Sequence, residues 1–70
     1  MPQGRRADRV DIYYRRRARA RTDDFRFLMT EVSIDGSDAL EGAREVVDRL
    51  QREFFGYEYI LVVVRWQPEP

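Results

Sequence analysis

Apolar and polar side chains alternate over residues 9–21. An alternation with a period of two is typical of a β-strand that buries one face. The apolar side weakens after Tyr14, so we expect the far end of this strand to be exposed. The positions that share its apolar parity are Val10, Ile12, Tyr14, Arg16, Ala18 and Ala20.

The segment Phe25–Ile34 predicts a second strand, which follows a short polar turn at residues 22–24. Apolar residues change parity within it: Phe25, Phe27 and Met29 share one, and Val32 and Ile34 share the other. A β-bulge between these two groups would explain the change, and so would burial of both faces. Because the connection is short, we expect the two strands to form an antiparallel hairpin.

A helix is predicted to follow Asp38 and to end near Phe55. Asp38 and Glu41 have the D-x-x-E spacing of a helix start, where a carboxylate accepts hydrogen bonds from free backbone N–H groups. Gly56 is expected to cap the other end. Apolar residues recur at steps of three and four and form one stripe, made of Leu40, Ala43, Val47, Leu50 and Phe54.

The segment Tyr57–Trp66 predicts a third strand. It carries apolar residues on both parities, which is typical of a strand buried on both faces. We interpret residues 1–8 as a flexible arm, 9–66 as a single domain and 67–70 as a tail. The expected fold is therefore α+β with the order β-β-α-β, a three-stranded sheet with one helix packed on one face. The right-handed crossover through the helix makes the third strand parallel to the second, and it lies beside either the first strand or the second.

This fold leaves an apolar surface without cover, because one helix covers only one face of the sheet. A 70-residue chain has a small core, so exposing several large apolar side chains is costly. We expect another protein surface to cover the second face, although the tails folding back would have the same effect. The predicted interface consists of Tyr57, Tyr59, Leu61, Val63 and Trp66, unless the other parity of this strand faces outward.

Arginine is concentrated in the first strand. On a strand, Arg15, Arg17, Arg19 and Arg21 would form a row on one face, with alternate residues about 6.7 Å apart. Such a row suits phosphates or carboxylates, and Tyr13 on the same face could stack on an unpaired base. Three interpretations remain open: a contact for an acidic protein surface, a contact for the nucleic-acid backbone, and a solvated edge that discourages aggregation.

The formal net charge of zero conceals a division along the chain. Residues 1–21 carry eight Arg and two Asp, a net charge of +6, and residues 22–70 carry five Arg and eleven acidic residues, a net charge of −6. The two parts of one chain could neutralise each other, and so could the parts of neighbouring copies.

The residue types present argue against an enzyme. The chain has no His, Cys or Lys, so it lacks the usual general base, thiolate and Schiff-base amine. We expect no metal, no cofactor and no small-molecule substrate, and we interpret the Asp35–Asp38 segment as a turn and a helix cap. The longest apolar run is far below the roughly 20 residues of a membrane span. The sequence thus predicts a soluble cytoplasmic association module, either a homo-oligomer or a subunit of a phage or bacterial assembly, with nucleic-acid binding as the alternative.

Overall fold

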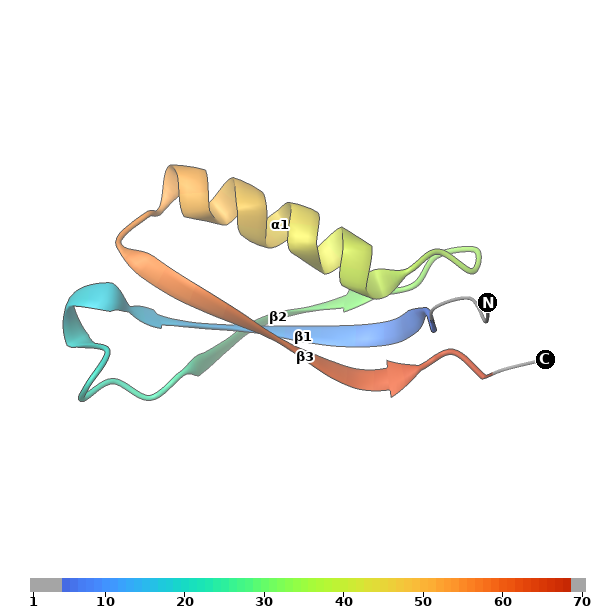
Figure 1. The fold of residues 1–70 in the computed structure, drawn as a ribbon, viewed down its shortest axis with the longest axis horizontal. Helices are drawn as coiled ribbons and strands as arrows, with labels where there is room; N and C mark the ends of the chain where they lie inside the picture. Colours follow the sequence, from blue (N-terminus) through green and yellow to red (C-terminus); the bar gives the residue numbers. More distant parts are fainter. Residues whose placement is uncertain (1–4, 69–70) are drawn as a thin grey trace.

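The computed structural model describes residues 5–68, so the outer parts of the predicted arm and tail lie outside the described residues. The chain runs through β1 (Ala7–Arg16), the short 3-10 helix η1 (Arg17–Arg19), β2 (Arg26–Val32), α1 (Ala39–Glu53) and β3 (Tyr57–Trp66) (Figure 1). The sheet has the order β2-β1-β3, and both outer strands are antiparallel to β1. The α+β class and the β-β-α-β order are confirmed, and the third strand lies beside the first, which is one of the two positions that the sequence left open.

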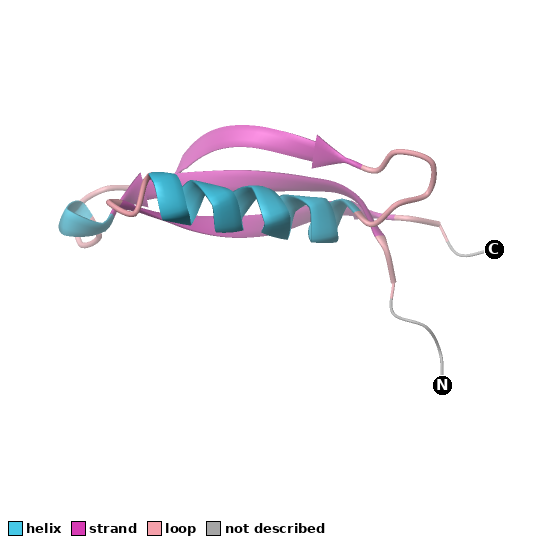
Figure 2. Ribbon diagram, turned by 90° about the horizontal axis from the view of Figure 1, so that it is seen from above, coloured by secondary structure: helices cyan, strands magenta, loops and turns pink. Residues whose placement is uncertain are grey.

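The core lies between α1 and the sheet. Seen from above, the helix lies over β1 and β3, whereas β2 stands beside it (Figure 2). The fully buried residues are small or β-branched, and partly buried apolar side chains from the two outer strands and the helix surround them. The buried set is Ala7, Val10, Ile12, Ala39 and Ala43, and the surrounding set is Met29, Leu40, Val46, Val47, Tyr59, Leu61 and Val63.

The first strand begins earlier and ends earlier than the sequence predicts. Ala7 belongs to β1 and is completely buried, so the inner end of the expected arm is part of the domain. The strand ends at Arg16, where the chain turns into η1. Beyond Tyr14 only alanines continue the apolar face, and they offer too little surface to hold an extended strand against the core.

A bulge in β2 explains the change of parity, but it lies earlier than predicted. Ile12 is opposite Met29 and Tyr13 is opposite Phe27, so Leu28 is the additional residue. The bulge places Phe27 and Val32 on the same sheet face although their numbers differ in parity, and it sends Met29 to the helix-covered side. The expected bulge between Met29 and Val32 is therefore wrong in position.

The start of α1 agrees with the prediction, and its end does not. Asp38 is the N-cap residue, and its side chain accepts a hydrogen bond from the Leu40 N–H at 3.1 Å. At the other end Phe54 is the C-cap residue, and its N–H donates to the Leu50 carbonyl at 2.6 Å. Gly56 has no positive φ, so the predicted left-handed glycine cap is wrong. Phe54 remains 52% exposed, which ends the buried stripe one turn early.

Candidate protein interface and arginine cluster

The two faces of β3 are assigned by its pairing with β1. Val63 lies opposite Val10 and Leu61 opposite Ile12, so both share the face that packs under the helix. Ile60 and Val62 lie opposite Tyr13 and Asp11, on the face that the helix leaves open.

This pairing corrects the expected interface residues. Tyr59, Leu61 and Val63 contribute to the core instead of lying on the open face. Tyr57 follows the same alternation, and its ring contacts Tyr14 edge-on at 5.8 Å between centroids. Trp66, at the end of the strand, is 37% exposed, and Arg5 lies over its ring at 5.4 Å. The sequence alone could not choose between the two parities because both are apolar.

The open face carries two columns of exposed apolar side chains, one on each outer strand. Each of them retains between 40% and 55% of its possible exposure. Such a concentration on one side of a small domain is typical of a surface that another molecule covers. We call this set the open-face patch; it consists of Phe27, Val32, Ile60, Val62 and Val64.

Between the two columns, β1 presents polar side chains whose partners lie within the same face. Asp11 accepts a hydrogen bond from the Thr30 hydroxyl at 2.8 Å, and the Arg9 guanidinium lies 3.9 Å from the Asp11 carboxylate. Tyr13 meets the Phe27 ring edge-on at 5.8 Å. Because these groups are already paired, covering the face would leave few polar groups without a partner.

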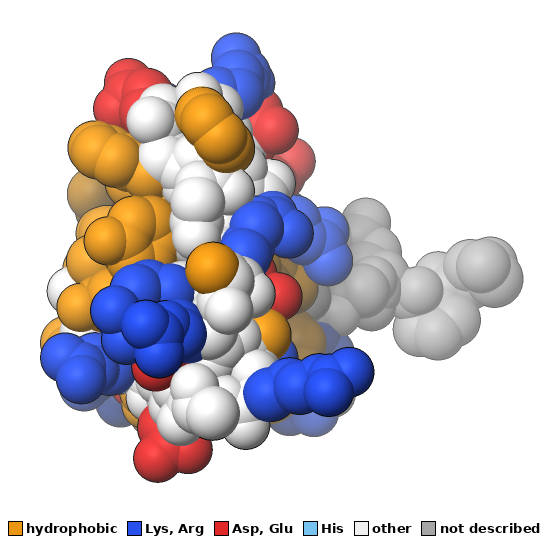
Figure 3. All heavy atoms as spheres, turned by 90° about the vertical axis from the view of Figure 1, so that its left-hand side faces the viewer, with side chains coloured by type: hydrophobic (Ala, Val, Ile, Leu, Met, Phe, Trp, Pro, Cys, Tyr) orange, Lys and Arg blue, Asp and Glu red, His pale blue; other side chains and the backbone are white. Residues whose placement is uncertain are grey.

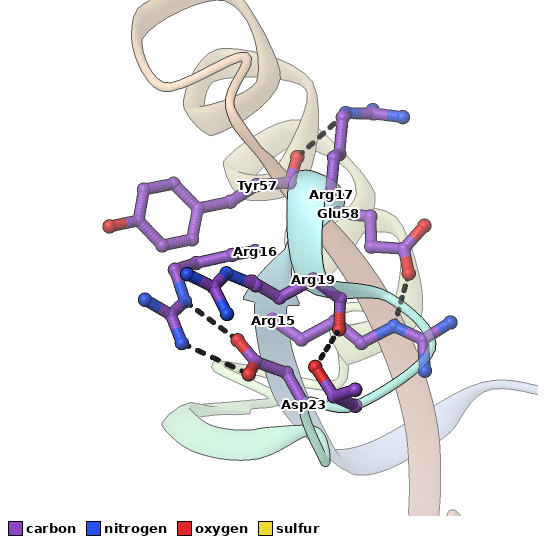
Figure 4. A network of polar contacts seen from close by, with 8 residues as sticks. Arg15, Arg16, Arg17, Arg19, Asp23, Tyr57 and Glu58 are labelled. Carbon is purple, nitrogen blue, oxygen red and sulfur yellow. Dashed lines mark hydrogen bonds and ion pairs between the residues drawn. The ribbon is translucent and has the colours of Figure 1, made fainter.

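The predicted row of arginines is not formed. Arg15 is the only one of the four on β1; it is ion-paired with Glu58 and lies over the Phe25 ring at 4.2 Å. Arg17 sits in η1, where its Nε donates to the carbonyls of Phe55 at 2.9 Å and Tyr57 at 3.1 Å (Figure 4). The turn therefore directs neighbouring arginines in different directions, and Tyr13 lies on the open face away from this turn.

Arg16, which was not singled out from the sequence, makes the best-formed ion pair of this region. Its Nε and Nη2 atoms donate to the two carboxylate oxygens of Asp23 at 2.7 and 3.0 Å. The hydrogen bond from Arg16 lowers the pKa of Asp23 below its usual 3.8, and the Asp23 partner raises the pKa of Arg16. This fork closes the β1–β2 connection and borders a polar pocket of about 260 Å³.

Within residues 5–68, the side chains of Arg19 and Arg21 make no hydrogen bond or ion pair. Both are exposed on the tip of the molecule that η1 forms. Figure 3 looks at this tip and shows basic side chains spread across it. We call Arg17, Arg19 and Arg21 the tip arginines.

An apolar groove of about 260 Å³ opens between the end of the helix and the sheet. Its lining residues are Tyr14, Leu28, Leu50, Phe54, Tyr57 and Tyr59. Burial raises the pKa of the Tyr59 phenol above its usual 10.0, and its hydroxyl donates to the Phe54 carbonyl at 3.4 Å. The groove is part of the incomplete cover that one helix gives to the sheet.

No protein-family model, curated protein or solved structure matches this chain. In the part of the chain that the structure describes, no helix is long and apolar enough to cross a membrane. Residues 5–68 also contain no group of three or more acidic, His or Cys side chains arranged to hold a metal ion. Asp38 serves as the helix cap, and Asp35 adopts a positive φ of 53° in the turn before it.

Proposed function

We propose that this protein is a non-enzymatic association module that binds a protein partner through the open face of its sheet. The single observation that carries the proposal is the open-face patch. Each patch residue would lose about half of its surface to a partner, and full burial of one aliphatic side chain contributes roughly 1.5–3 kcal/mol. Several such contacts together match the gain that a chain of this size needs from association.

The polar residues of β1 support the same proposal. They run between the two apolar columns and are paired with each other or with neighbouring strands. A partner can therefore cover the patch without burying unpaired charges, which is the usual obstacle to docking on a charged surface. We place such a module in the cytoplasm, or in a virion if the protein comes from a phage.

The experiment compares the wild type with Phe27→Asp/Val32→Asp, in which both changes lie on β2 and on the open face. Light scattering coupled to size exclusion gives the absolute mass at low and at high salt. We expect the wild type to associate at both salt concentrations, because the contact is apolar, and the double variant to have a lower mass while keeping its circular dichroism spectrum.

The matched control is Arg44→Asp/Glu45→Arg on the exposed side of the helix, which should leave the mass unchanged. Equal association by the wild type and the Phe27→Asp/Val32→Asp variant contradicts the proposal for self-association through the open face. If the wild type stays monomeric, the two proteins are compared as baits for a purified candidate partner, and equal binding contradicts the proposal altogether.

A second candidate function is binding of a nucleic-acid backbone by the tip arginines. Its support is the exposure of Arg19 and Arg21, whose side chains make no ion pair or hydrogen bond within the described residues. Arg binds phosphate through a planar fork of donors, and such contacts are independent of base sequence. Fluorescence anisotropy with a labelled single-stranded oligonucleotide should show binding that Arg19→Glu/Arg21→Glu abolishes. Unchanged binding by this variant contradicts the second candidate.

A further inference from the structure

The outer edge of β3 lacks a neighbouring strand. Among the described residues, β3 pairs only with β1 and forms one border of the sheet. Its stretch from Tyr59 to Val64 has no charged residue, no Gly and no Pro. A long, regular and apolar edge of this kind is a template for pairing with another strand.

The backbone groups along this edge can be assigned from the ladder with β1. The Arg17 N–H donates to the Gly56 carbonyl at 2.9 Å, and from Arg16 to Val10 each residue of β1 keeps an unbroken register with β3. Because opposite residues alternate between hydrogen-bonded and non-bonded pairs, the even-numbered residues of β3 direct their N–H and C=O groups toward β1.

Tyr59, Leu61 and Val63 therefore direct their backbone groups toward the free edge. The ladder between β1 and β2 gives the same assignment. The Ser33 N–H donates to the Asp8 carbonyl at 2.9 Å, so the even-numbered residues of β1 form their backbone hydrogen bonds with β2 and the odd-numbered residues form theirs with β3. Three consecutive outward residues thus offer three donors and three acceptors in one row.

The opposite border of the sheet is shorter and has its bulge within the strand, whereas the charges and the register shift of β3 lie toward its ends, at Glu58, Val64 and Arg65. β2 has seven residues against ten in β3, and it contains the bulge at Leu28. It also carries Arg26 and Glu31 within the strand. Short length, bulges and charges are the usual means by which proteins prevent edge pairing. With its unbroken, uncharged stretch from Tyr59 to Val63, the β3 border is the better template for a new strand.

We infer that a second copy of this chain pairs with the β3 edge, antiparallel and around a two-fold axis through Leu61. This inference goes beyond the proposed docking on the open face, because the β3 edge is a separate contact that leaves the open-face patch exposed. Leu61 then lies opposite Leu61 of the second copy, and Tyr59 lies opposite Val63 of the second copy. Every outward N–H and C=O group of these residues is satisfied.

The charges at the two ends of β3 fit this arrangement. Glu58 lies near the start of the strand and Arg65 near its end. Antiparallel pairing brings Glu58 of one copy to the end that carries Arg65 of the other, so the ends complement each other in sign. Parallel pairing would place like charges together, which is unfavourable.

The two-fold axis is perpendicular to the sheet, so both helices lie on one side and both open-face patches on the other. Ile60 of one copy then lies directly opposite Val62 of the other, on the open face. The two three-stranded sheets become one continuous sheet, and the apolar surface available to a further partner doubles. A heterologous contact that repeats would form fibres, whereas this symmetric contact closes.

The experiment exploits the absence of cysteine from the natural chain. Ile60→Cys and Val62→Cys are prepared separately, and each is oxidised alone and as an equal mixture. Opposite residues of a non-bonded antiparallel pair have Cα atoms about 4.5 Å apart, within the range that a disulfide spans. Position 60 lies diagonally from position 60 of the second copy, too far for a disulfide.

We expect most of the mixture to form a disulfide-linked heterodimer, with only background cross-linking in either variant alone. Ile60→Cys mixed with Val32→Cys is the matched control, because Val32 is exposed on the same face but lies on β2. The same mixtures in denaturant give the level of random cross-linking. Both cysteine positions are exposed, and circular dichroism verifies that the variants remain folded.

Cross-linking that is as strong in the control mixture, or in one variant alone, overturns the two-fold register. A wild-type protein that remains monomeric at millimolar concentration overturns the inference as well. The inference and the proposed function can fail independently. Association that the Phe27→Asp/Val32→Asp changes abolish, without a link between positions 60 and 62, supports docking on the open face and rejects the β3 contact.

Discussion

The carboxylate of Asp38 accepts a hydrogen bond from the backbone N–H of Ala7 at 2.9 Å, across 31 positions of the chain. The same Oδ1 atom accepts the Leu40 N–H at the start of α1. One carboxylate oxygen thus joins the first residue of the central strand to the first turn of the helix. It satisfies two backbone donors beside the buried Ala7 and Ala39 side chains.

Asp38→Ala should therefore cost more than the loss of an ordinary helix cap. A cap contributes about 1 kcal/mol, and a buried N–H left without a partner costs about 1–3 kcal/mol. We expect the free energy of unfolding to fall by about 2–3 kcal/mol in urea denaturation. Asp24→Ala is the control, since Asp24 is exposed in a turn. Equal stability of these two variants would show that the Asp38–Ala7 contact contributes nothing.

The two sides of β3 should respond in opposite ways to a buried charge. Val63→Asp places a carboxylate under the helix, among the residues that surround the core. An unpaired charge there costs at least about 3 kcal/mol, which removes much of the stability of so small a domain. We expect the far-UV circular dichroism spectrum to show unfolding.

Val62→Asp, one residue away, should retain the folded spectrum because its side chain is 43% exposed on the open face. A folded Val63→Asp together with an unfolded Val62→Asp would reverse the assignment of the two faces.

Gly42 offers a route to higher stability. A Cβ at this helix position would lie 3.3 Å from Glu31 Oε1, the far end of a flexible side chain that can move aside. Ala exceeds Gly in helix propensity by about 1 kcal/mol. Gly42→Ala should therefore raise the free energy of unfolding by up to that amount and shift the denaturation midpoint upward. The contrast is Gly36→Ala, which should lower the midpoint because Gly36 has a φ of 77°. A lower midpoint for Gly42→Ala would mean that Glu31 is held rigidly.

The ion pair between Arg16 and Asp23 gives stability a dependence on pH. The folded-state pKa of Asp23 lies below its ordinary value of 3.8, chiefly because of the hydrogen bond from Arg16. Its contribution is therefore present above that ordinary value and is lost as the pH falls through the lower folded-state pKa. The melting temperature of Asp23→Asn should lie below that of the wild type at about pH 6, and the two should converge at about pH 2.

The matched variant Asp24→Asn should follow the wild type at both pH values, because the Asp24 side chain makes no ion pair or hydrogen bond within residues 5–68. A direct NMR titration of the Asp23 carboxyl carbon provides a second measurement. Its pKa should return toward the ordinary value in Arg16→Gln. A constant difference between Asp23→Asn and the wild type across the pH range would exclude this ionisation as the cause.

The helix and the order of elements could be predicted from the sequence because their signals are local. The Asp38 cap and the spacing of Leu40, Ala43 and Val47 lie within a few residues of each other. The open-face residues of β3 could not be predicted, because Val62 and Val63 are equally apolar and only the pairing with β1 distinguishes them.

The prediction that the arginines form a row on one strand face was wrong for a related reason. Alternation continues in the sequence to Arg21, yet the extended backbone ends at Arg16. The sequence around an arginine does not show whether its neighbours have a core to pack against. The carbonyls of Phe55 and Tyr57, which bind Arg17, also come from a distant part of the chain. The bulge at Leu28 likewise depends on which residues of β1 lie opposite.

The position of β1 in the centre of the sheet has a consequence for how the protein folds. Ile12 pairs with Leu61, 49 positions later, whereas its other partner, Met29, belongs to the adjacent hairpin. Long-range pairs form slowly because the intervening chain must first close a loop. The hairpin and α1 are thus expected to form before β3 docks. During that interval β3 can join the hairpin of another chain, so refolding at high concentration favours exchange of β3 between molecules.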